Sequence, residues 1–573
     1  MALLALLLAT QAATLPYDLA EVRPGLRGTC VTEWTDGERW EIPIEVMGVL
    51  DGAGPERTAV LVRFDDPRFA ESGVPAGMSG SPVYIDGRLL GAVAFGWAFA
   101  REPLAGVTPF AVMRRLELAL APPSGPPPPT LQQLAALARG ADLPLAALPT
   151  VPRPADWAPQ PVAVAGLPLA GGFTAEVLAR AGLLATPGAA SGGGGGVPEA
   201  GEMVAALLVW GDATVAAGGT VTARDGDTLY AFGHPLLGLG AVTLPAARSR
   251  VLAVQTSFQN PFKVFAVGER FGAFVTDRPA GMVARVGPVP SGLPLSVTIR
   301  RGEEETRWGF EIARLPLLEP LLAAFVVNGA LTARGAGVGE ATVRLKLTAT
   351  LADGATSMVV QDFTGLDALA RTAAFAGAFL GFLSNSSFPH PAVERLEVRA
   401  EHTEAPRRAT IVQAHPRRRR VRPGEELTLT VHLQPEAGAP TQVRLAVRVP
   451  ADTPPGRLDL VVADGAAWTD YQLRANAINP TSFAQQLAQV ALIDTASTLV
   501  AALEAFEPGI AAPGASMPGL PPSWAATLAT GLSPSQATRL RTAAVAVARW
   551  QAPYPLAGAL RIPLAVEEFR EKP

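Results

Sequence analysis

Cysteine and histidine are both scarce in this chain. Cys30 is the single cysteine among 573 residues, which excludes an internal disulfide and a cysteine-based metal site. The five histidines are His234, His390, His402, His415 and His432. They lie far apart and lack the spacing of metal ligands. We therefore expect neither a metal nor a cofactor.

Charge and long apolar runs are also limited. Charged residues make up 17% of the chain and the formal net charge is −4, which gives no reason to expect a nucleic-acid partner. The best candidate for a membrane span, Leu366 to Leu383, carries Asp367 and Arg371. Two charges in so short a run suit a buried helix better than a membrane helix.

Glycine and proline are abundant, at 57 and 54 residues, and 49% of the chain is apolar. This composition is typical of β-rich globular domains with many turns, and the length suffices for several domains. The first 13 residues read MALLALLLATQAA, a short apolar core ending in small residues, as in a secretory signal peptide. We therefore predict export to the periplasm, the cell surface or the medium, with association with an envelope or membrane surface left open. A buried first strand or helix is the alternative.

A glycine-rich turn presents a serine early in the chain. Gly77–Pro82 reads GMSGSP, and two apolar strands follow, joined by the pair Asp86-Gly87, which is a strong hairpin signal. Glycine permits the positive φ of a tight turn, and the N–H groups around such a turn can form an oxyanion hole. Trypsin-like enzymes share this arrangement. Ser79 is therefore the candidate nucleophile and Ser81 a structural hydroxyl, against the alternative of a turn without chemistry.

The residues before this turn extend the pattern. Asp66–Pro82 reads DPRFAESGVPAGMSGSP and resembles the end of the SpoIVB-type sporulation serine peptidases. In that family the Asp of the Asp-Pro-Arg step is the triad acid and the first serine of the turn is the nucleophile. The resemblance thus implies Asp66 and Ser79 in those roles, although Asp65 is a rival and either acid could cap a turn. By analogy with trypsin-like turns, we expect the N–H groups of Gly77 and Ser79 to form the oxyanion hole.

A second segment carries the candidate base. Ala217–Pro235 reads AGGTVTARDGDTLYAFGHP, a strand, an Asp-Gly turn and a strand that ends at His234. It resembles the family segment in which Gly-x-Gly-Thr-Leu-Thr leads to Ala-Leu-Gly-His, whose histidine is the general base. The alternative is a strand-end histidine satisfied by backbone. The family runs its histidine half first, whereas here the Asp and Ser half comes first, so the resemblance implies a permuted chain.

We therefore predict a mainly β chain with α additions: a permuted, two-lobe, trypsin-like β-barrel peptidase, then a β-sandwich and a helical C-terminal region. The expected segments are a signal peptide (1–13), a lobe with the Asp/Ser motif (14–121), a Pro/Gly-rich helical insert or linker (122–200), a lobe with the His motif (201–300), a β segment plus a helix (301–390), an immunoglobulin-like sandwich (391–475) and a helical region (476–573). We expect helices at Ser482–Phe506 and Ser533–Trp550, and a flexible linker at Gly192–Gly196.

The predicted function is a serine endopeptidase that cleaves protein or peptide substrates through Ser79, His234 and Asp66. Residues 91–99 are expected to wall the specificity pocket, with Trp97 and Phe99 as either apolar substrate contacts or core. The alternative is a non-catalytic envelope protein that uses a degenerate protease fold to bind a partner or glycan.

Overall fold

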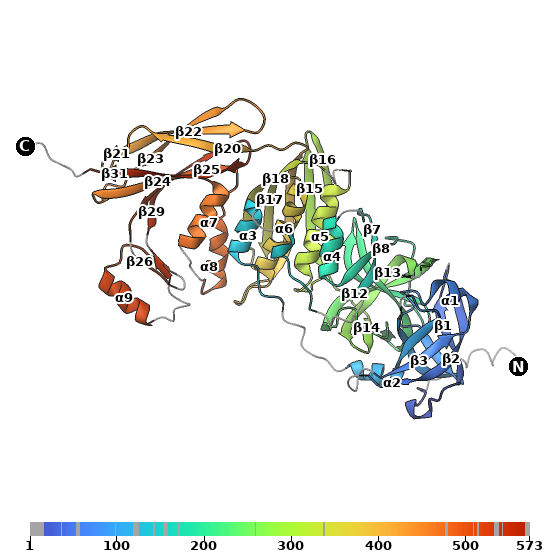
Figure 1. Cartoon of the computed structure of the whole chain (residues 1–573). Coiled ribbons are helices and arrows are strands. Elements are labelled where there is room, and N and C mark those ends of the chain that lie inside the picture. Colours follow the sequence, from blue (N-terminus) through green and yellow to red (C-terminus); the bar gives the residue numbers. More distant parts are fainter. Residues whose placement is uncertain are drawn as a thin grey trace, which may run out of the picture. The chain divides into compact units, whose positions relative to one another are not determined.

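The computed structural model describes residues 16–35, 37–52, 58–97, 99–117, 125–140, 144–152, 159–169, 172–257, 259–335, 339–475, 480–507, 509–512, 515–531, 538–540 and 542–567. The predicted signal peptide lies outside this range. The structure is 49% strand and 19% helix, which confirms the expected mainly β class. The chain forms two compact units (Figure 1). Unit 1 comprises Met1–Gly125, Thr150–Pro294 and Gly309–Leu322; unit 2 comprises Pro126–Pro149, Leu295–Trp308 and Ala323–Pro573.

Unit 1 begins with a closed barrel of six antiparallel strands in the order β1-β2-β3-β6-β5-β4. The strands are β1 (Arg27–Glu33), β2 (Arg39–Leu50), β3 (Ala59–Phe64), β4 (Pro82–Ile85), β5 (Arg88–Gly96) and β6 (Leu104–Pro109). Apolar side chains that alternate along the strands fill the barrel interior. In β2, for example, Ile42, Ile44 and Val46 are fully buried, while the residues between them are more exposed. Asp86 and Gly87 both have positive φ, as the predicted hairpin turn requires. The short helices here are η1 (Leu19–Glu21), α1 (Pro67–Ser72), α2 (Phe110–Met113) and η2 (Arg114–Glu117).

A second ring of six antiparallel strands follows in the same unit. Its order is β9-β12-β13-β14-β11-β10, and a further pairing of β10 with β9 closes it. The strands are β9 (Met203–Gly211), β10 (Thr214–Asp225), β11 (Thr228–Ala231), β12 (Gly240–Gln255), β13 (Phe262–Arg278) and β14 (Gly281–Val286). Residues Phe310–Ile312 of β16 (Glu304–Ile312) pair with β9 on its outer side.

The segment expected to be an insert or linker contributes to this second sheet. β7 (Gln160–Ala165) pairs with β10, and β8 (Leu183–Pro187), which follows α4 (Gly172–Arg180), runs parallel to β7. The glycine run also packs here, because Gly193 N donates to Val267 O at 3.1 Å and Glu269 N donates to Gly194 O at 2.9 Å. An added Cβ on Gly193 would lie 2.4 Å from Gly268 N. The flexible-linker prediction is therefore wrong: the glycines allow two backbones to touch.

Unit 2 contains a sheet region in the order β18-β17-β19-β15, in which β19 and β15 are parallel. The elements are β15 (Leu293–Arg301), α5 (Glu319–Thr332), β17 (Ala341–Leu351), β18 (Thr356–Gly365), α6 (Ala368–Ser384), β19 (Val393–Thr403), α3 (Leu131–Arg139) and η3 (Pro144–Ala147). Helix α6 is buried almost throughout, which confirms the helix predicted from Leu366 to Leu383. The Arg371 guanidinium donates to the carbonyls of Leu137 and Ala138 at the end of α3, where a cation is favourable. Within the described residues, no helix has the length and apolarity needed to cross a bilayer.

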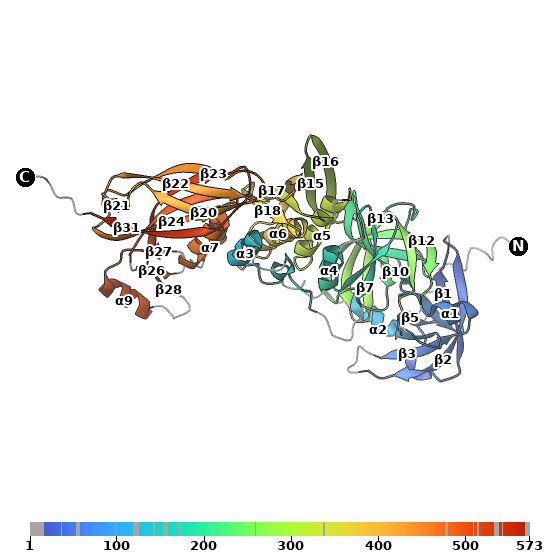
Figure 2. The same ribbon diagram turned by 45° about the horizontal axis from the view of Figure 1, so that its top comes forward.

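The rest of unit 2 is a β-sandwich of a four-stranded sheet, β23-β22-β20-β30, and a five-stranded sheet, β21-β31-β24-β25-β29 (Figure 2). Its core is apolar and includes Leu429, Val431, Leu460 and Leu503. The strands are β20 (Ala409–Pro416), β21 (Arg420–Val421), β22 (Glu426–Pro435), β23 (Thr441–Arg448), β24 (Gly456–Asp464), β25 (Thr498–Ala505), β29 (Ala543–Gln551), β30 (Leu556–Ala557) and β31 (Ala559–Val566). The other elements are α7 (Gly465–Ala475), α8 (Phe483–Ala488), η4 (Gln489–Leu492), α9 (Pro522–Gly531) and the small sheet of β26 (Gly509–Ala512), β27 (Ala515–Met517) and β28 (Thr538–Leu540).

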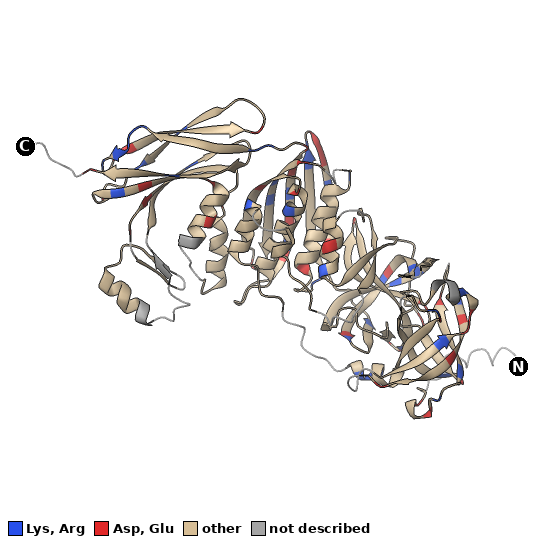
Figure 3. Cartoon of the chain, in the orientation of Figure 1, with Lys and Arg blue, Asp and Glu red and all other residues tan. Residues whose placement is uncertain are grey.

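The two long helices predicted near the C-terminus are wrong. Ser482 caps only the short helix α8, and the segments further on form strands β25 and β29 inside the sandwich. β25 is buried along its whole length, so its continuous apolar run has no period that separates strand from helix. The sandwich therefore extends well past residue 475. Acidic and basic residues are interspersed in both units rather than gathered (Figure 3).

Candidate active site

Ser79 and His234 meet in unit 1, although 155 residues separate them in the chain. Ser79 precedes strand β4 of the first ring, and His234 lies three residues after β11 of the second ring. Ser79 Oγ lies 2.8 Å from His234 Nε2. Both residues are partly exposed, whereas Gly80, Gly233 and most of their other neighbours are buried. The pair is therefore partly accessible to solvent and rests on buried backbone.

The other ring nitrogen of His234 determines the tautomer. His234 Nδ1 lies 2.7 Å from the carbonyl oxygen of Pro235. Because a carbonyl oxygen only accepts hydrogen bonds, Nδ1 must carry the proton and donate it. The neutral ring then leaves Nε2 bare, so Nε2 accepts the hydroxyl proton of Ser79. Burial lowers the pKa of His234 below its ordinary 6.5, and the Pro235 carbonyl opposes that shift.

The turn around Ser79 is held through its carbonyl oxygens. Each of the six carbonyls from Ala76 to Ser81 accepts a hydrogen bond of 2.7 to 2.9 Å. Two of the donors are side chains of β10: Thr220 Oγ1 donates to Gly77 O and Thr222 Oγ1 donates to Gly80 O. Strand β10 of the second ring thus fixes the turn of the first.

The amides of the same turn are used differently. Those of Ala76, Met78, Gly80 and Ser81 donate to backbone carbonyls. Within the described chain, the amides of Gly77 and Ser79 donate no hydrogen bond. Two N–H groups, that of Ser79 and that of the residue two positions before it, are therefore available to a bound oxyanion.

Close backbone approach at Gly80 brings the two rings together. Gly80 has φ +95°, and an added Cβ would lie 1.9 Å from Thr220 O and 2.5 Å from Phe232 N. Phe232 itself has φ +69°, which is uncommon for a bulky residue. Its buried ring meets the Phe274 ring edge-on at 5.7 Å. Backbone strain two residues before His234 is typical of a functional segment.

A buried carboxylate holds the loop after His234. The Oδ1 atom of Asp277 accepts from Leu236 N at 2.7 Å, and its Oδ2 atom accepts from Leu237 N at 2.9 Å and Leu239 N at 3.2 Å. Asp277 lies near the end of β13 and is 1% exposed. Burial raises the pKa of Asp277, and the loop amides oppose that shift. Directly before His234, Gly233 O accepts from Thr108 Oγ1 of β6 at 2.6 Å.

Asp66 is not brought to His234. It is the N-cap of α1, where its carboxylate accepts from Arg68 N at 3.0 Å and from the Arg68 guanidinium. That guanidinium lies over the Trp40 ring at 3.7 Å, and its hydrogen bond to Asp66 lowers the pKa of the carboxyl. The rival Asp65 is exposed and pairs with Arg27 at 3.6 Å. The predicted Asp66 to His234 contact is therefore corrected: Asp-Pro-Arg forms a local cap, and the Pro235 carbonyl orients the ring.

A buried polar cluster lies beneath the turn. Thr32 Oγ1 accepts from Ser81 Oγ and from Lys263 Nζ, both at 2.8 Å, so the Ser81 hydroxyl is buried and bonded away from the site. The Lys263 stem lies 3.1 to 3.3 Å from where a Cβ on Gly77 would be. Burial lowers the pKa of Lys263 to about 7, with nearby Glu33 opposing. Within the described residues, no group of histidines, cysteines and carboxylates is arranged to hold a metal.

The end of β5 presents exposed aromatic side chains. Phe95, Trp97 and Phe99 are 44%, 49% and 68% exposed, so Trp97 and Phe99 are not core. Phe95 and Trp97 meet edge-on at 5.4 Å. The same strand reaches the nucleophile turn, because Val93 O accepts from Gly80 N and Val93 N donates to Ser81 O. Residues 91–99, which were expected to wall a specificity pocket, therefore lie beside the Ser79 turn at Val93 and carry exposed aromatic rings at their far end.

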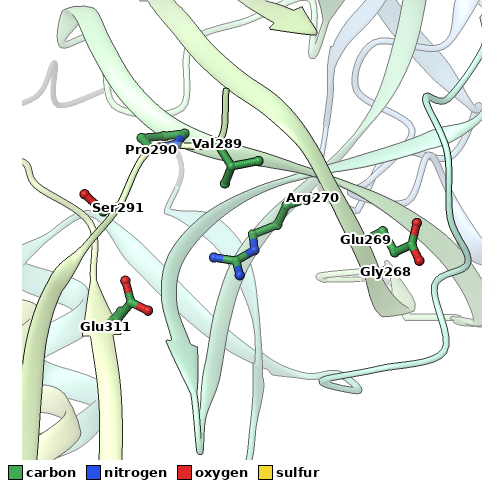
Figure 4. A pocket seen from close by; sticks show the side chains of 7 residues that line it. All are labelled: Gly268, Glu269, Arg270, Val289, Pro290, Ser291 and Glu311. Atoms are coloured by element: carbon green, nitrogen blue, oxygen red, sulfur yellow. The ribbon is translucent and has the colours of Figure 1, made fainter. Parts of the chain in front are cut away.

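A polar pocket of about 630 Å³ lies elsewhere in unit 1. Its lining includes Glu269, Arg270 and Glu311, whose charged groups all appear in Figure 4. Neither Ser79 nor His234 lines it, so it adds nothing to the pair described above.

Sequence reasoning missed the residues that hold the site, namely Asp277, Thr108, Thr220 and Thr222. Asp277 carries a weak signal, since it is an acid in the otherwise apolar and small run GAFVTD of a buried strand. The threonines carry no signal, because hydroxyls that bond to backbone look like any strand threonine. No protein-family model, curated protein or solved structure matches this chain.

Proposed function

We propose that the chain is a serine endopeptidase in which Ser79 is the nucleophile and His234 the general base. The observation that carries the proposal is the 2.8 Å hydrogen bond between Ser79 Oγ and His234 Nε2, together with the tautomer that the Pro235 carbonyl imposes. A serine hydroxyl is a weak nucleophile until a neighbouring base takes its proton.

The reaction follows from the positions of the groups. Nε2 takes the proton as Ser79 Oγ attacks the substrate carbonyl, and the oxyanion that forms accepts from the Gly77 and Ser79 amides. The imidazolium then gives the proton to the leaving amine, which breaks the peptide bond and leaves an acyl-serine. Water, deprotonated by the same nitrogen, hydrolyses the ester and restores the hydroxyl.

The fold supports the same proposal. Two closed rings of six antiparallel strands each contribute one reacting group, and the free amides occupy the nucleophile position and the position two residues before it. Trypsin-like peptidases likewise divide their site between two β-barrels, and this likeness supports the proposal, as do the motifs that resemble SpoIVB-type peptidases with the serine ring first. We propose a permuted relative of that family, which acts outside the cytoplasm on protein or peptide substrates.

The test is labelling of the purified chain by a fluorophosphonate, which reacts with activated serines. We expect labelling of the wild type, none in Ser79→Ala, and a large loss in His234→Ala. Ser81→Ala is the matched control, because it removes a buried hydroxyl from the same turn and should retain labelling. Cleavage of fluorescent casein, again dependent on Ser79, would identify the bond type. Absence of labelling in the folded wild type would overturn the proposal and favour a non-catalytic binding protein.

A further inference from the structure

The peptide group between Pro235 and Leu236 is hydrogen-bonded at both of its polar atoms. Its carbonyl oxygen accepts from His234 Nδ1 at 2.7 Å. Its N–H, which belongs to Leu236, donates to Asp277 Oδ1 at 2.7 Å. One amide unit therefore connects the imidazole to a buried carboxylate. With Ser79 on Nε2, the bonds run in series from the nucleophile to Asp277.

We propose that Asp277 is the positioning residue of this reaction and acts on His234 through the Pro235–Leu236 peptide group. The proposal rests on the function proposed above. An anion that accepts from an amide N–H draws electron density toward the carbonyl oxygen of the same amide, which makes that oxygen a better acceptor. The carbonyl then stabilises the imidazolium that forms when Ser79 gives up its proton. In Ser-His-Asp triads the acid makes this contact directly.

Both carboxylate oxygens of Asp277 act as hydrogen-bond acceptors. The bonds from Leu236, Leu237 and Leu239 all come from backbone N–H groups, and a carboxylate offers only acceptors. The bonds to Leu237 and Leu239 fix the loop, and the bond to Leu236 completes the series. Asp277 therefore combines two roles, a structural one for the loop and an electrostatic one for the ring.

Among the described residues, Arg278 is the charged side chain next to Asp277 in the chain. The cross-strand neighbours of Asp277 are Gly240 and Met282, which are uncharged. The described groups around the His234 ring are Ser79, the Pro235 carbonyl and the edge of Phe232. Burial and the Pro235 carbonyl are what act on the pKa of His234, and burial and the amides of 236–239 are what act on that of Asp277.

The first test is Asp277→Asn, with the rate constant of fluorophosphonate labelling measured from about pH 5 to about pH 9. The amide keeps one acceptor oxygen and removes the charge. We expect the plateau rate to fall about tenfold and the midpoint of the rise to move to lower pH by about half a unit, because the imidazolium loses support. Asp277→Glu, which restores the charge, should recover part of the rate.

Glu33→Gln is the matched control. Glu33 is also a buried carboxylate that accepts two backbone amides, those of Met203 and Val251, but neither amide belongs to the peptide group whose carbonyl contacts His234. It should lower the melting temperature without moving the pH midpoint. An Asp277→Asn profile with the wild-type midpoint and plateau would overturn the inference, as would an equal midpoint shift in Glu33→Gln.

An amide-to-ester replacement tests the series even if Asp277→Asn fails to fold. An ester at Leu236 removes the N–H within the series, and an ester at Leu237 removes a neighbouring N–H that also bonds to Asp277. We expect slower labelling and a lower midpoint only for the ester at 236. Equal rates for the two esters would overturn the inference, whereas loss of labelling in the unmodified chain would instead count against the proposed function.

Discussion

The nucleophile turn and the histidine loop are held in opposite ways. The turn from Ala76 to Ser81 is fixed through its carbonyl oxygens by amides and threonine hydroxyls. The loop from Leu236 to Leu239 is fixed through its N–H groups by one carboxylate. Beneath the turn lies a buried amine, Lys263, and beneath the loop a buried acid, Asp277.

This difference decides which backbone groups remain for chemistry. In the turn, the carbonyl oxygens are all hydrogen-bonded, whereas the amides of Gly77 and Ser79 have no hydrogen bond within the described residues. Those two amides can stabilise a developing negative charge. Amides that are bonded to an anion strengthen the carbonyl that receives the imidazole N–H, which suits a developing positive charge. The scaffold of each segment thus prepares it for the charge that the proposed reaction would create there.

Gly80→Ala should have the largest effect, because it disrupts the contact between the turn and β10. The new Cβ would lie 1.9 Å from Thr220 O at positive φ, so the turn must leave β10. We expect a loss of at least about 3 kcal/mol of unfolding free energy and no labelling. Gly87→Ala is the control, since Gly87 also has positive φ but no atom within 4 Å of the added Cβ, and it should cost only about 1 kcal/mol. Equal losses in chemical denaturation would contradict this account.

Lys263→Met tests the buried amine under the turn. The pKa of Lys263 is about 7 in the folded chain and 10.5 ordinarily, so the unfolded chain binds more protons between these values. Stability should therefore rise as pH increases from 7 toward 10.5 in the wild type, and less so in the variant. The variant should therefore gain stability relative to the wild type as the pH falls from 10.5 toward 7. Melting temperatures that follow the same pH slope in both proteins would refute the prediction.

Comparison of Thr220→Val with Thr222→Val tests whether a threonine acts only on stability or also on the labelling rate. Each removes a hydroxyl that satisfies a buried carbonyl, so each should cost about 1–3 kcal/mol. Thr220 bonds to Gly77, which carries one of the free amides, whereas Thr222 bonds to Gly80, which does not. We expect the labelling rate to fall further in Thr220→Val at similar stability, and a reversed order would show that the free amides are not involved.

Asp66→Ala should have the smallest effect. It removes the N-cap of the six-residue helix α1 and should cost about 1 kcal/mol in denaturation. Its labelling rate and pH midpoint should match the wild type, because Asp66 bonds to Arg68 and not to His234. A loss of rate as large as that of Asp277→Asn would restore Asp66 as the acid of the site.

The two side chains of the candidate site could be predicted from the sequence, but the groups that hold them in place could not. Ser79 and His234 stand in short motifs of glycine, strand and turn, and the structure places them in hydrogen-bond contact. Asp66 stands in a motif too, yet its local bonds to Arg68 decide its position. His234 is oriented by the main-chain carbonyl of Pro235, and a pattern of side chains cannot predict a main-chain contact. The alanine-rich segments of β25 and β29 were predicted to be helices because alanine has a high helix propensity. They form strands because they pack in the sandwich.

Each six-stranded ring is closed by strands from one continuous stretch, residues 27–109 for the first and 203–286 for the second. During synthesis the ring that carries the serine emerges and closes before the base exists, because domains fold in order from the N-terminus. Under the function proposed above, a growing chain therefore cannot form the Ser79–His234 pair until more than 230 residues have been made. For the proposed peptidase, this order of the rings would keep the unfinished chain inactive.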